Sequence, residues 1–355
     1  MHMSDVLISP VVGGTMWAAT LAVSYYSVKK VQKNFDENQE YQELNEKKIP
    51  LMGVMGAFVF ASQMINFTIP GTGSSGHIGG GMILAALLGP YAGFLTLSCI
   101  LAIQALFFAD GGLLALGSNI FNMGFYTCFI AYPFIYKKII KNKMSKKKIL
   151  IASILSVVIG LQLGAFSVVL QTVISGKTEL PFQTFVLFMQ PIHLAIGIIE
   201  GLITSAVISF VYSTRPEILQ PIKENTFNKK VSYKKIITVL LSLTIVIGGF
   251  ISYFASSNPD GLEWSIEKTE KTIVSNPTEE NGESKIHKFL GKIQEKIAFL
   301  PDYGFKNNSE ETELYTVNAG TSVSGIVGSL LTLSLIVLIG KVAKNYKNKY
   351  NVKQN

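Results

Sequence analysis

The first two residues, Met1 and His2, have the chemistry of a metal chelator at the start of the chain. The terminal amine, the amide nitrogen of His2 and Nδ1 of its imidazole can close one five-membered and one six-membered chelate ring around a single ion. These three in-plane nitrogens leave one corner of a square for an imidazole from elsewhere. Planar nitrogen coordination favours Ni²⁺ or Cu²⁺, with low-spin Co²⁺ also possible. His77 is the candidate for the fourth ligand, so metal binding depends on whether the fold brings it to the N-terminus.

His77 directly follows a glycine-rich run, Gly-Thr-Gly-Ser-Ser-Gly at residues 71–76. The run has the Gly-x-Gly-x-x-Gly spacing of a dinucleotide-binding loop, but that loop works only between a strand and a helix that holds a pyrophosphate. Here the run follows an apolar segment, so the match is accidental. The glycines either let the backbone approach a ligand or form a flexible turn, and the sequence leaves both open. No carboxylate or thiol cluster competes for the metal. Neighbouring polar residues that could orient a ligating imidazole are Asn66, Thr72, Ser74 and Ser75.

The composition is that of a membrane protein, with 48% hydrophobic and 15% charged residues and a mean hydropathy of +0.37. A helix needs roughly 20 apolar residues to cross a hydrocarbon core of about 30 Å, and only helices satisfy their backbones at this density. The runs that are long enough lie at 7–28, 50–69, 91–108, 113–136, 149–171, 187–212, 236–255 and 322–342. A shorter run at 78–89 is either a buried crossing or a re-entrant turn. The predicted fold is all-α, a polytopic membrane helical bundle.

The charged loops favour nine crossings over eight. If residues 78–89 cross and the N-terminus lies outside, the basic segments 137–148 and 215–235 and the tail from Lys341 all lie inside, as the positive-inside rule requires. Without that crossing, every basic segment after it would lie outside. This topology places the N-terminus and the glycine-rich run on the same, extracytoplasmic face. The net charge of +8 is then explained by loops that face anionic lipid, so nucleic acid is not an expected partner.

The first apolar run is predicted to be a retained helix and not a signal peptide. The residues before it carry no lysine or arginine, and the charged loop after it offers no small-residue cleavage site. Met1 is expected to be retained, because methionine removal requires a small second residue and His2 is large. Cys99 and Cys128 both fall inside predicted spans, where we expect them to pack and not to pair.

Three regions follow from the composition along the chain. Residues 1–212 are predicted to form a seven-helix membrane domain that carries the candidate metal ligands, and residues 213–235 a basic cytoplasmic linker. Residues 236–345 are predicted to form a module of two membrane helices that flank an extracytoplasmic domain at 256–320. That outer domain stands out because it holds 12 of the chain's 23 acidic residues against 7 lysines. We expect it to modulate loading of the metal site.

His193 and Glu200 lie seven residues apart in the seventh predicted crossing, and therefore on one helical face. Ionisable residues at membrane depth are costly, which makes them candidates for function. An interhelical polar clamp is favoured over metal ligation for this pair. A membrane enzyme would use the two residues as acid and base, yet the sequence shows no nucleophile or hydrolytic metal cluster near them. A passive metal-ion channel, the other alternative, would need a polar ring through spans that are mostly apolar.

The chain has no nucleotide-binding loop in its sequence. Residues 176–178, Gly-Lys-Thr, resemble the end of a P-loop, but the phosphate cradle needs a glycine where Gln171 stands. Uphill movement of a solute would therefore require a partner that hydrolyses ATP. The candidate docking face for that partner is a stripe of small residues at every fourth position, which allows close helix approach: Gly53, Ala57 and Ala61.

Several segments together form a specific pattern. The most specific is Gln104 to Gly124, QALFFADGGLLALGSNIFNMG. The others are the start Met-His-Met, Ser9-Pro10, Phe58 to Asn66, Gly76-His77 and Leu88-Gly89-Pro90. Over residues 1–212 these segments resemble the CbiM/NikM family, the substrate-capture components of energy-coupling factor (ECF) transporters for cobalt or nickel. Residues 258–264 (NPDGLEW) and 300–303 (LPDY) resemble motifs of the small NikN-type subunit, here fused in line.

The resemblance implies a metal site formed by the terminal amine of Met1, the amide and imidazole of His2, and the imidazole of His77. It implies two kinds of partner, a transmembrane coupling protein and paired cytoplasmic ATPases. The implied function is capture of Ni²⁺ or Co²⁺ outside a bacterial or archaeal cell membrane for ATP-driven uptake, by a component that is not an enzyme and holds no permanent cofactor. Residues 3–4 (Met-Ser) differ from the Ile-Pro or Ile-Met of many relatives, which leaves the metal open. A ligand role for His287 is also open.

Overall fold

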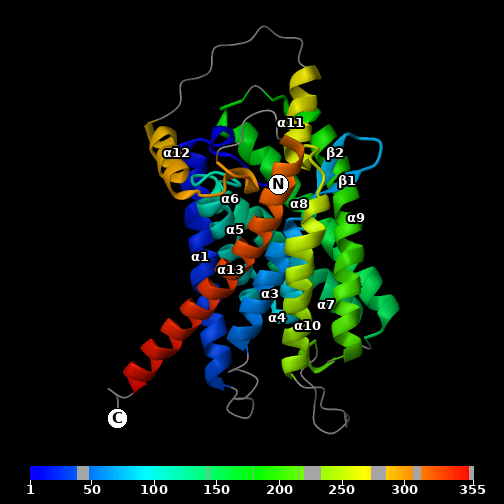
Figure 1. Cartoon of the computed structure of the whole chain (residues 1–355), viewed down its shortest axis with the longest axis vertical. Helices are drawn as coiled ribbons and strands as arrows, with labels where there is room; N and C mark the ends of the chain where they lie inside the picture. The colour runs from blue at the N-terminus through cyan, green and yellow to red at the C-terminus, as the bar shows by residue number, and fades with distance from the viewer. Residues whose placement is uncertain are drawn as a thin grey trace.

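The computed structural model describes residues 1–37, 48–141, 144–178, 180–214, 216–219, 233–272, 285–306 and 313–351, and it shows a helical bundle with the N-terminus inside its upper part (Figure 1). The helices of the first part are α1 (Pro10–Glu37), α3 (Lys48–Gln63), α4 (Gly81–Leu88), α5 (Pro90–Phe107), α6 (Leu116–Ile120), the π-helix η3 (Phe121–Tyr136), α7 (Lys137–Ile140), α8 (Lys146–Ser175) and α9 (Phe182–Thr214). Short 3₁₀ turns are η1 (Asp5–Leu7) and η4 (Pro216–Ile218). The predicted all-helical membrane bundle is confirmed.

The helix lengths agree with a multi-pass membrane protein. Within the described ranges, 5 helical segments are long and apolar enough to cross a membrane: Pro90–Phe107, Lys146–Ser175, Phe182–Thr214, Ile237–Phe254 and Ala319–Lys341. Each falls on a predicted run. From Leu116 onward, the run 113–136 lies in a continuous helix formed by α6, η3 and α7, whose π-helical part contains Pro133. Proline has no N–H to donate, which disturbs regular α-helical bonding there.

Two predicted crossings differ from the observed elements. The run 50–69 is helical only to Gln63, because the chain then forms a hairpin of β1 (Phe67–Ile69) and antiparallel β2 (Ser74–Gly76). Gly71 and Gly73 make the hairpin turn at φ of 76° and 75°, a region that favours glycine. The run 78–89 forms the short, fully buried α4, which at about 1.5 Å per residue is too short to cross a membrane by itself.

The chain nevertheless enters the bundle through α4 and returns through α5. His2 stacks on His77, which precedes α4. The same His2 contacts Asp110, which follows α5. Both ends of the α4–α5 pair therefore lie at the end of the bundle that holds the N-terminus. This arrangement brings three segments distant in sequence to one place.

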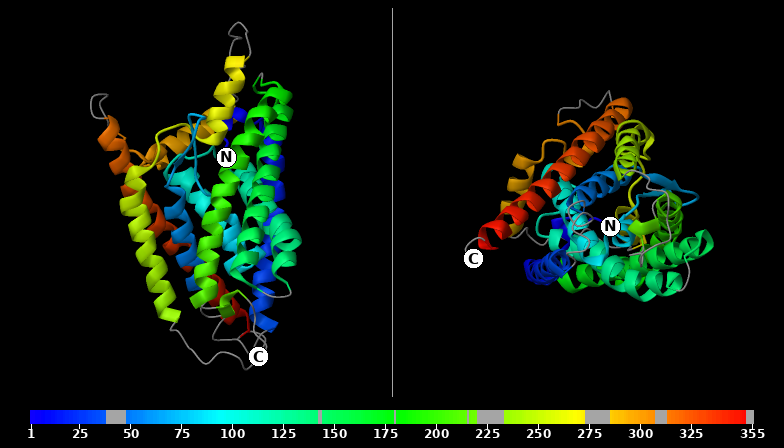
Figure 2. Two further views of the ribbon diagram at one scale, coloured as in Figure 1. Left: turned by 90° about the vertical axis from the view of Figure 1, so that its right-hand side faces the viewer. Right: turned by 90° about the horizontal axis from the view of Figure 1, so that it is seen from below.

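The C-terminal helices pack beside α3. They are α10 (Tyr233–Ile245), continued by η5 (Val246–Phe250) and η6 (Ile251–Phe254), and α13 (Glu313–Asn351), which runs obliquely along the bundle (Figures 1 and 2). Ser329 of α13 donates a hydrogen bond to the Ala57 carbonyl oxygen at 3.0 Å. A Cβ atom on Gly53 would lie 2.9 Å from Leu333 Cδ1. The prediction of a partner-docking face on this stripe is wrong, because α13 of the same chain covers it.

The remaining elements lie over the end of the bundle that holds the N-terminus of the chain. They are α11 (Gly261–Thr272) and α12 (Lys285–Ile297), which Figure 1 shows, and the short turn η7 (Pro301–Tyr303). Most of the predicted linker 213–235 lies outside the described residues. Cys99 and Cys128 are both free thiols, as expected.

Candidate metal site

The N-terminal segment lies inside the bundle, where α6 holds it by its backbone. The Met3 amide donates to Asn119 Oδ1 at 2.8 Å, and Asn119 Nδ2 donates to the Met3 carbonyl oxygen at 3.1 Å. The same carbonyl accepts a hydrogen bond from the Gly112 amide at 2.9 Å. Met3 has 0% exposed surface, so these bonds satisfy backbone groups that burial would otherwise leave unpaired. Asn119 therefore positions the two residues that precede Met3.

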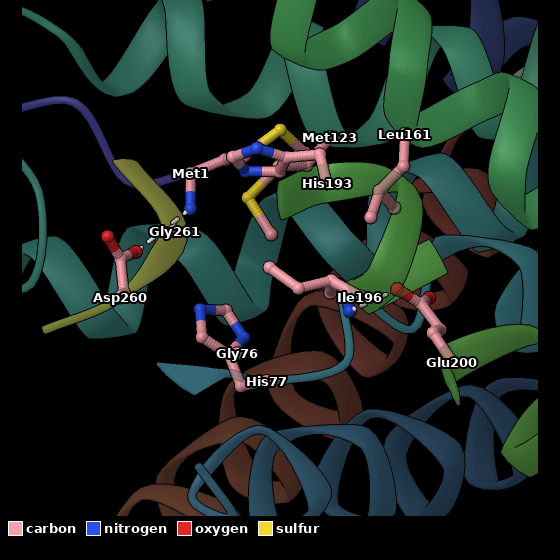
Figure 3. A pocket seen from close by; sticks show the side chains of 11 residues that line it. Met1, Gly76, His77, Met123, Leu161, His193, Ile196, Glu200, Asp260 and Gly261 are labelled. Carbon is pink, nitrogen blue, oxygen red and sulfur yellow. Dashed lines mark hydrogen bonds and ion pairs between the residues drawn. The ribbon is translucent and has the colours of Figure 1, made fainter. Parts of the chain in front are cut away.

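The loop that carries His77 is fixed by two helices. Glu200 of α9 accepts hydrogen bonds from the amides of Gly79 and Gly80, each at 2.9 Å. Gln63 of α3 donates to the Gly79 carbonyl oxygen at 2.9 Å. These bonds satisfy irregular backbone at the N-terminus of α4, where exposed amides and the helix dipole favour a carboxylate. His77 projects from this fixed loop into a pocket (Figure 3).

Met1 and His77 line the same small pocket near the N-terminal end of the bundle (Figure 3). The His2 ring stacks on the His77 ring, with centroids 5.3 Å apart and 8° between the planes. Nδ1 of His77 lies 3.1 Å from the Ile78 carbonyl oxygen. A proton on Nδ1 would satisfy that carbonyl and leave the lone pair of Nε2 for a metal. The structure thus brings together the three residues predicted as metal ligands.

Two carboxylates that the sequence did not reveal contact the proposed donor groups. The terminal amine of Met1 donates to Asp260 Oδ2 at 3.1 Å, and Nδ1 of His2 lies 3.0 Å from Asp110 Oδ1. Only the fold joins these residues, which lie far apart in the sequence. In the sequence, each aspartate stands before a glycine inside a specific motif, which by itself is only a weak signal.

The surroundings of the candidate ligands determine the charge of His77, Asp110 and Asp260. Burial lowers the pKa of His77 to about 4, with His2 and the terminal amine acting in the same direction. Burial alone would raise the pKa of Asp110, but the charge of His2 and its hydrogen bond outweigh this and hold that pKa at about 2. For Asp260 the terminal amine likewise outweighs burial and keeps the pKa well below its usual range. At neutral pH the His77 imidazole is therefore in its neutral, metal-binding form beside two charged carboxylates.

His193 and Glu200 lie in the same pocket but do not act as an acid–base pair in this geometry. Both oxygens of the Glu200 carboxylate accept backbone hydrogen bonds from the loop before α4. Nδ1 of His193 lies 2.8 Å from the Met189 carbonyl oxygen within its own helix. Glu200 thus ties α9 to the His77 loop, as a polar clamp would. The geometry gives no support to an enzyme that uses these two residues.

The polar residues predicted to orient His77 instead hold the C-terminal module. The Ser75 amide donates to the Pro259 carbonyl oxygen at 2.8 Å, and Ser75 Oγ donates to the Asn258 carbonyl oxygen at 2.7 Å. The indole N–H of Trp264 donates to the Thr72 carbonyl oxygen at 2.9 Å. These bonds attach the loop before α11 to the β1–β2 hairpin. The prediction failed because the hairpin faces the module, which sequence reasoning treated as a separate unit.

Side chains alone do not supply a metal site in the described part of the chain. Groups of three or more His, Cys, Asp or Glu residues that could hold an ion are absent from those ranges. The proposed ligands at Met1, His2 and His77 are of another kind, because two of the donors are a terminal amine and a backbone amide.

Comparisons with known proteins match two families to successive parts of the chain. The family described as "Cobalt uptake substrate-specific transmembrane region", CbiM, matches residues 2–218, and the PDGLE domain matches residues 234–345. The "Putative fused nickel transport protein NikMN" of Archaeoglobus fulgidus is 29% identical over 97% of this chain and 99% of its own length.

Two further relatives agree. The "Fused nickel transport protein NikMN" of Rhodobacter capsulatus is 31% identical over 62% of this chain and 64% of its own length. A solved structure titled "Crystal Structure of an Truncated Transition metal Transporter" is 32% identical, with a TM-score of 0.51 over 60% of this chain and 99% of that one. The chain therefore belongs to the CbiM family, with a PDGLE domain joined to its C-terminal side.

Proposed function

We propose that this chain captures Ni²⁺ or Co²⁺ at the extracytoplasmic face of a bacterial or archaeal cell membrane and delivers it for ATP-driven uptake in an ECF-type transporter. The observation that carries the proposal is the meeting of Met1, His2 and His77 at one end of the bundle. The relatives support it, since their names assign them nickel or transition-metal transport. The ion is cargo, and no permanently bound cofactor is required.

The ligands in this proposal are four nitrogens: the amine of Met1, the amide and Nδ1 of His2, and an imidazole nitrogen of His77. Four nitrogens in a plane favour Ni²⁺ over ions that prefer tetrahedral or oxygen-rich sites. The ligands must be deprotonated to bind, so affinity should rise as the pH rises. The neutral imidazole of His77 supplies its lone pair at neutral pH without a proton to lose.

Metal binding requires the His2 side chain to turn. Parallel rings with centroids 5.3 Å apart present faces and not lone pairs to each other. Nδ1 of His2 must therefore leave Asp110 and turn toward the side of its own amide nitrogen. The amine must lose one proton to free its lone pair, while its remaining N–H bonds can still donate to Asp260. Both carboxylates stay beside the site and can balance the charge of the bound cation.

The partners in this proposal are a transmembrane coupling protein and paired ATPases on the cytoplasmic side. In the described part of the chain, the residues that resemble a P-loop end have other roles. Gln171 exchanges hydrogen bonds with Asn122 inside the bundle, and Gly176 ends α8 at φ of 58°. ATP hydrolysis is therefore assigned to another subunit.

Ni²⁺ binding to the purified chain tests the proposed site directly. His77→Ala, and separately one extra residue before Met1, should each weaken binding by more than the roughly 10- to 100-fold that outer-shell changes cost. His287→Gln is the matched control, because Nε2 of His287 lies at the Ile8 carbonyl oxygen and outside the pocket lining. Unchanged affinity in both test variants would refute the site.

Absorption spectra of the chain loaded with Ni²⁺ or Co²⁺ in turn would identify the preferred ion and its geometry. A planar nitrogen site predicts tighter binding of Ni²⁺. ATP-independent metal flux through vesicles that contain the chain alone would favour a passive channel and contradict the proposed dependence on partners.

A further inference from the structure

We propose that Asp260 of the C-terminal module is a positioning residue for metal capture, which holds the terminal amine of Met1 in the pocket beside His77. The inference rests on the proposed function, because it concerns the same site. It adds the means by which the module acts on the site: a single carboxylate that contacts the first donor group of the chain.

The two oxygens of Asp260 have separate partners. Oδ1 accepts hydrogen bonds from the amides of Leu262 at 2.8 Å and Glu263 at 2.9 Å, which is the geometry of a helix N-cap for α11. Oδ2 accepts from the Met1 amine at 3.1 Å. The N-cap fixes the carboxylate at the positive end of α11. The second oxygen is thereby aimed at the N-terminus by a rigid element.

The next residue in the motif closes the pocket. Gly261 lines it, and a Cβ atom at this position would lie 3.1 Å from His193 Cε1 and 3.0 Å from Ile196 Cδ1. Glycine therefore lets the module backbone approach α9 closely. Figure 3 shows Asp260 and Gly261 on the side of the pocket where the Met1 amine lies.

The hairpin before His77 holds this loop in place. Backbone bonds join Ser75 to Pro259 at 2.8 Å and Asn66 to Ser256 at 2.8 Å. Trp264 adds an indole hydrogen bond to Thr72. Asp260 and His77 are thus positioned by one connected framework, so the distance between the amine and the His77 loop depends on docking of the module.

A second contact from the module reaches His2 indirectly. The hydroxyl group of Tyr303 donates to Asp110 Oδ2, and Asp110 Oδ1 contacts Nδ1 of His2. Tyr303 and Asp302 have φ of 61° and 49°, a left-handed conformation that non-glycine residues adopt at a cost. The module therefore contacts the N-terminal donors twice, directly at Met1 and through Asp110 at His2.

Asp260→Asn is the decisive variant, because asparagine is as good an N-cap as aspartate but cannot form the ion pair. We expect it to weaken Ni²⁺ binding by about 10- to 100-fold, the usual effect of removing a residue that orients a ligand. Asp260→Glu, which keeps the charge, should recover part of the affinity. Glu267→Gln is the control, since it removes an exposed charge from α11 that pairs with Lys271 and not with the N-terminus.

Two readouts separate positioning from a folding defect. The rate at which an amine-selective acylating reagent labels the Met1 amine should increase in Asp260→Asn, because the amine is released from the pocket. Trp264 fluorescence, read in a Trp17→Phe background that leaves one tryptophan, should stay unchanged if the module remains docked. Together these show release of the amine without release of the module.

The possible outcomes distinguish the two proposals. Loss of binding in His77→Ala with unchanged binding in Asp260→Asn would overturn this inference alone. Tighter binding in Asp260→Asn would also overturn it, since Asp260 would then compete with the metal for the amine. Unchanged binding in His77→Ala and in the N-terminally extended chain would overturn the proposed site itself.

Discussion

At the scale of single residues, the candidate metal site is held together by side chains that hydrogen-bond to the backbone beside the proposed ligands. Asn119 pairs with both backbone groups of Met3, and Glu200 binds two amides after His77. These residues hold the two halves of the site at a fixed separation. Their contribution follows from the cost of leaving a buried amide or carbonyl unpaired, about 1–3 kcal/mol for each group.

Asn119→Ala should therefore lower both stability and metal affinity. We expect a loss of about 1–3 kcal/mol in unfolding free energy, because the buried Met3 amide loses its acceptor, together with weaker Ni²⁺ binding. Thermal unfolding in detergent and metal titration measure the two effects. Asn122→Ala is the matched control, since it breaks a buried pair with Gln171 but no backbone bond of Met3. Equal metal affinity in the two variants would contradict a positioning role for Asn119.

The sequence predicted that Met1, His2 and His77 would meet, because chelation by an N-terminus needs only the second residue and one distant imidazole, and the fold brings the three together. It did not reveal Asp110 and Asp260 as their partners. A lone aspartate before a glycine is typical of any turn, and its ion pair appears only when the chain is folded. The neighbours of His77 were assigned to the wrong partner for the same reason.

At the scale of elements, glycines of the bundle mark where helices touch. A Cβ atom on Gly328 of α13 would lie 2.0 Å from Phe60 Cζ on α3. Gly14 of α1 has nothing within 4 Å of that position. The same substitution at these two glycines should therefore have opposite effects.

Gly328→Ala should destabilise the chain by about 1–3 kcal/mol through overpacking against Phe60. Gly14→Ala should be neutral or stabilising by up to about 1 kcal/mol, because alanine has the higher helix propensity. Thermal unfolding of both variants in the same detergent measures the difference. Similar midpoints for the two would show that α13 does not press on α3 as described.

Apolar length predicted the positions of the long helices but not their neighbours. Small residues at every fourth position look the same whether the facing helix belongs to the same chain or to a partner, which explains the error at Gly53. The short α4 was also ambiguous, because its burial depends on the helices around it and not on its own sequence.

At the scale of the whole molecule, charge and topology agree. The outward faces of α8 and α9 carry exposed apolar side chains, as lipid contact requires: Leu155, Ile159, Leu163, Phe166, Leu194, Ile198 and Leu202. The start of α8, which has the sequence Lys-Lys-Lys, lies at the end of the bundle opposite to α11 (Figure 1).

Labelling from one side of the membrane tests this orientation. In a Cys99→Ser, Cys128→Ser background, an impermeant thiol reagent added outside intact cells should label Glu267→Cys and not Lys147→Cys, both of which are exposed positions. Permeabilised cells should show labelling at both positions, which controls for reactivity. Labelling of Lys147→Cys alone in intact cells would invert the proposed topology.

The loop before α11 and the turn at Tyr303 reach the membrane domain as parts of the same polypeptide. Closure over the pocket is therefore unimolecular, at an effective concentration that reaches millimolar for a short tether. Contacts equivalent to a dissociation constant of about 1 mM, or roughly 4 kcal/mol, would then keep the C-terminal module closed over the pocket half of the time. Contacts of this strength would let the module open over the pocket and close again without diffusing away from the membrane domain.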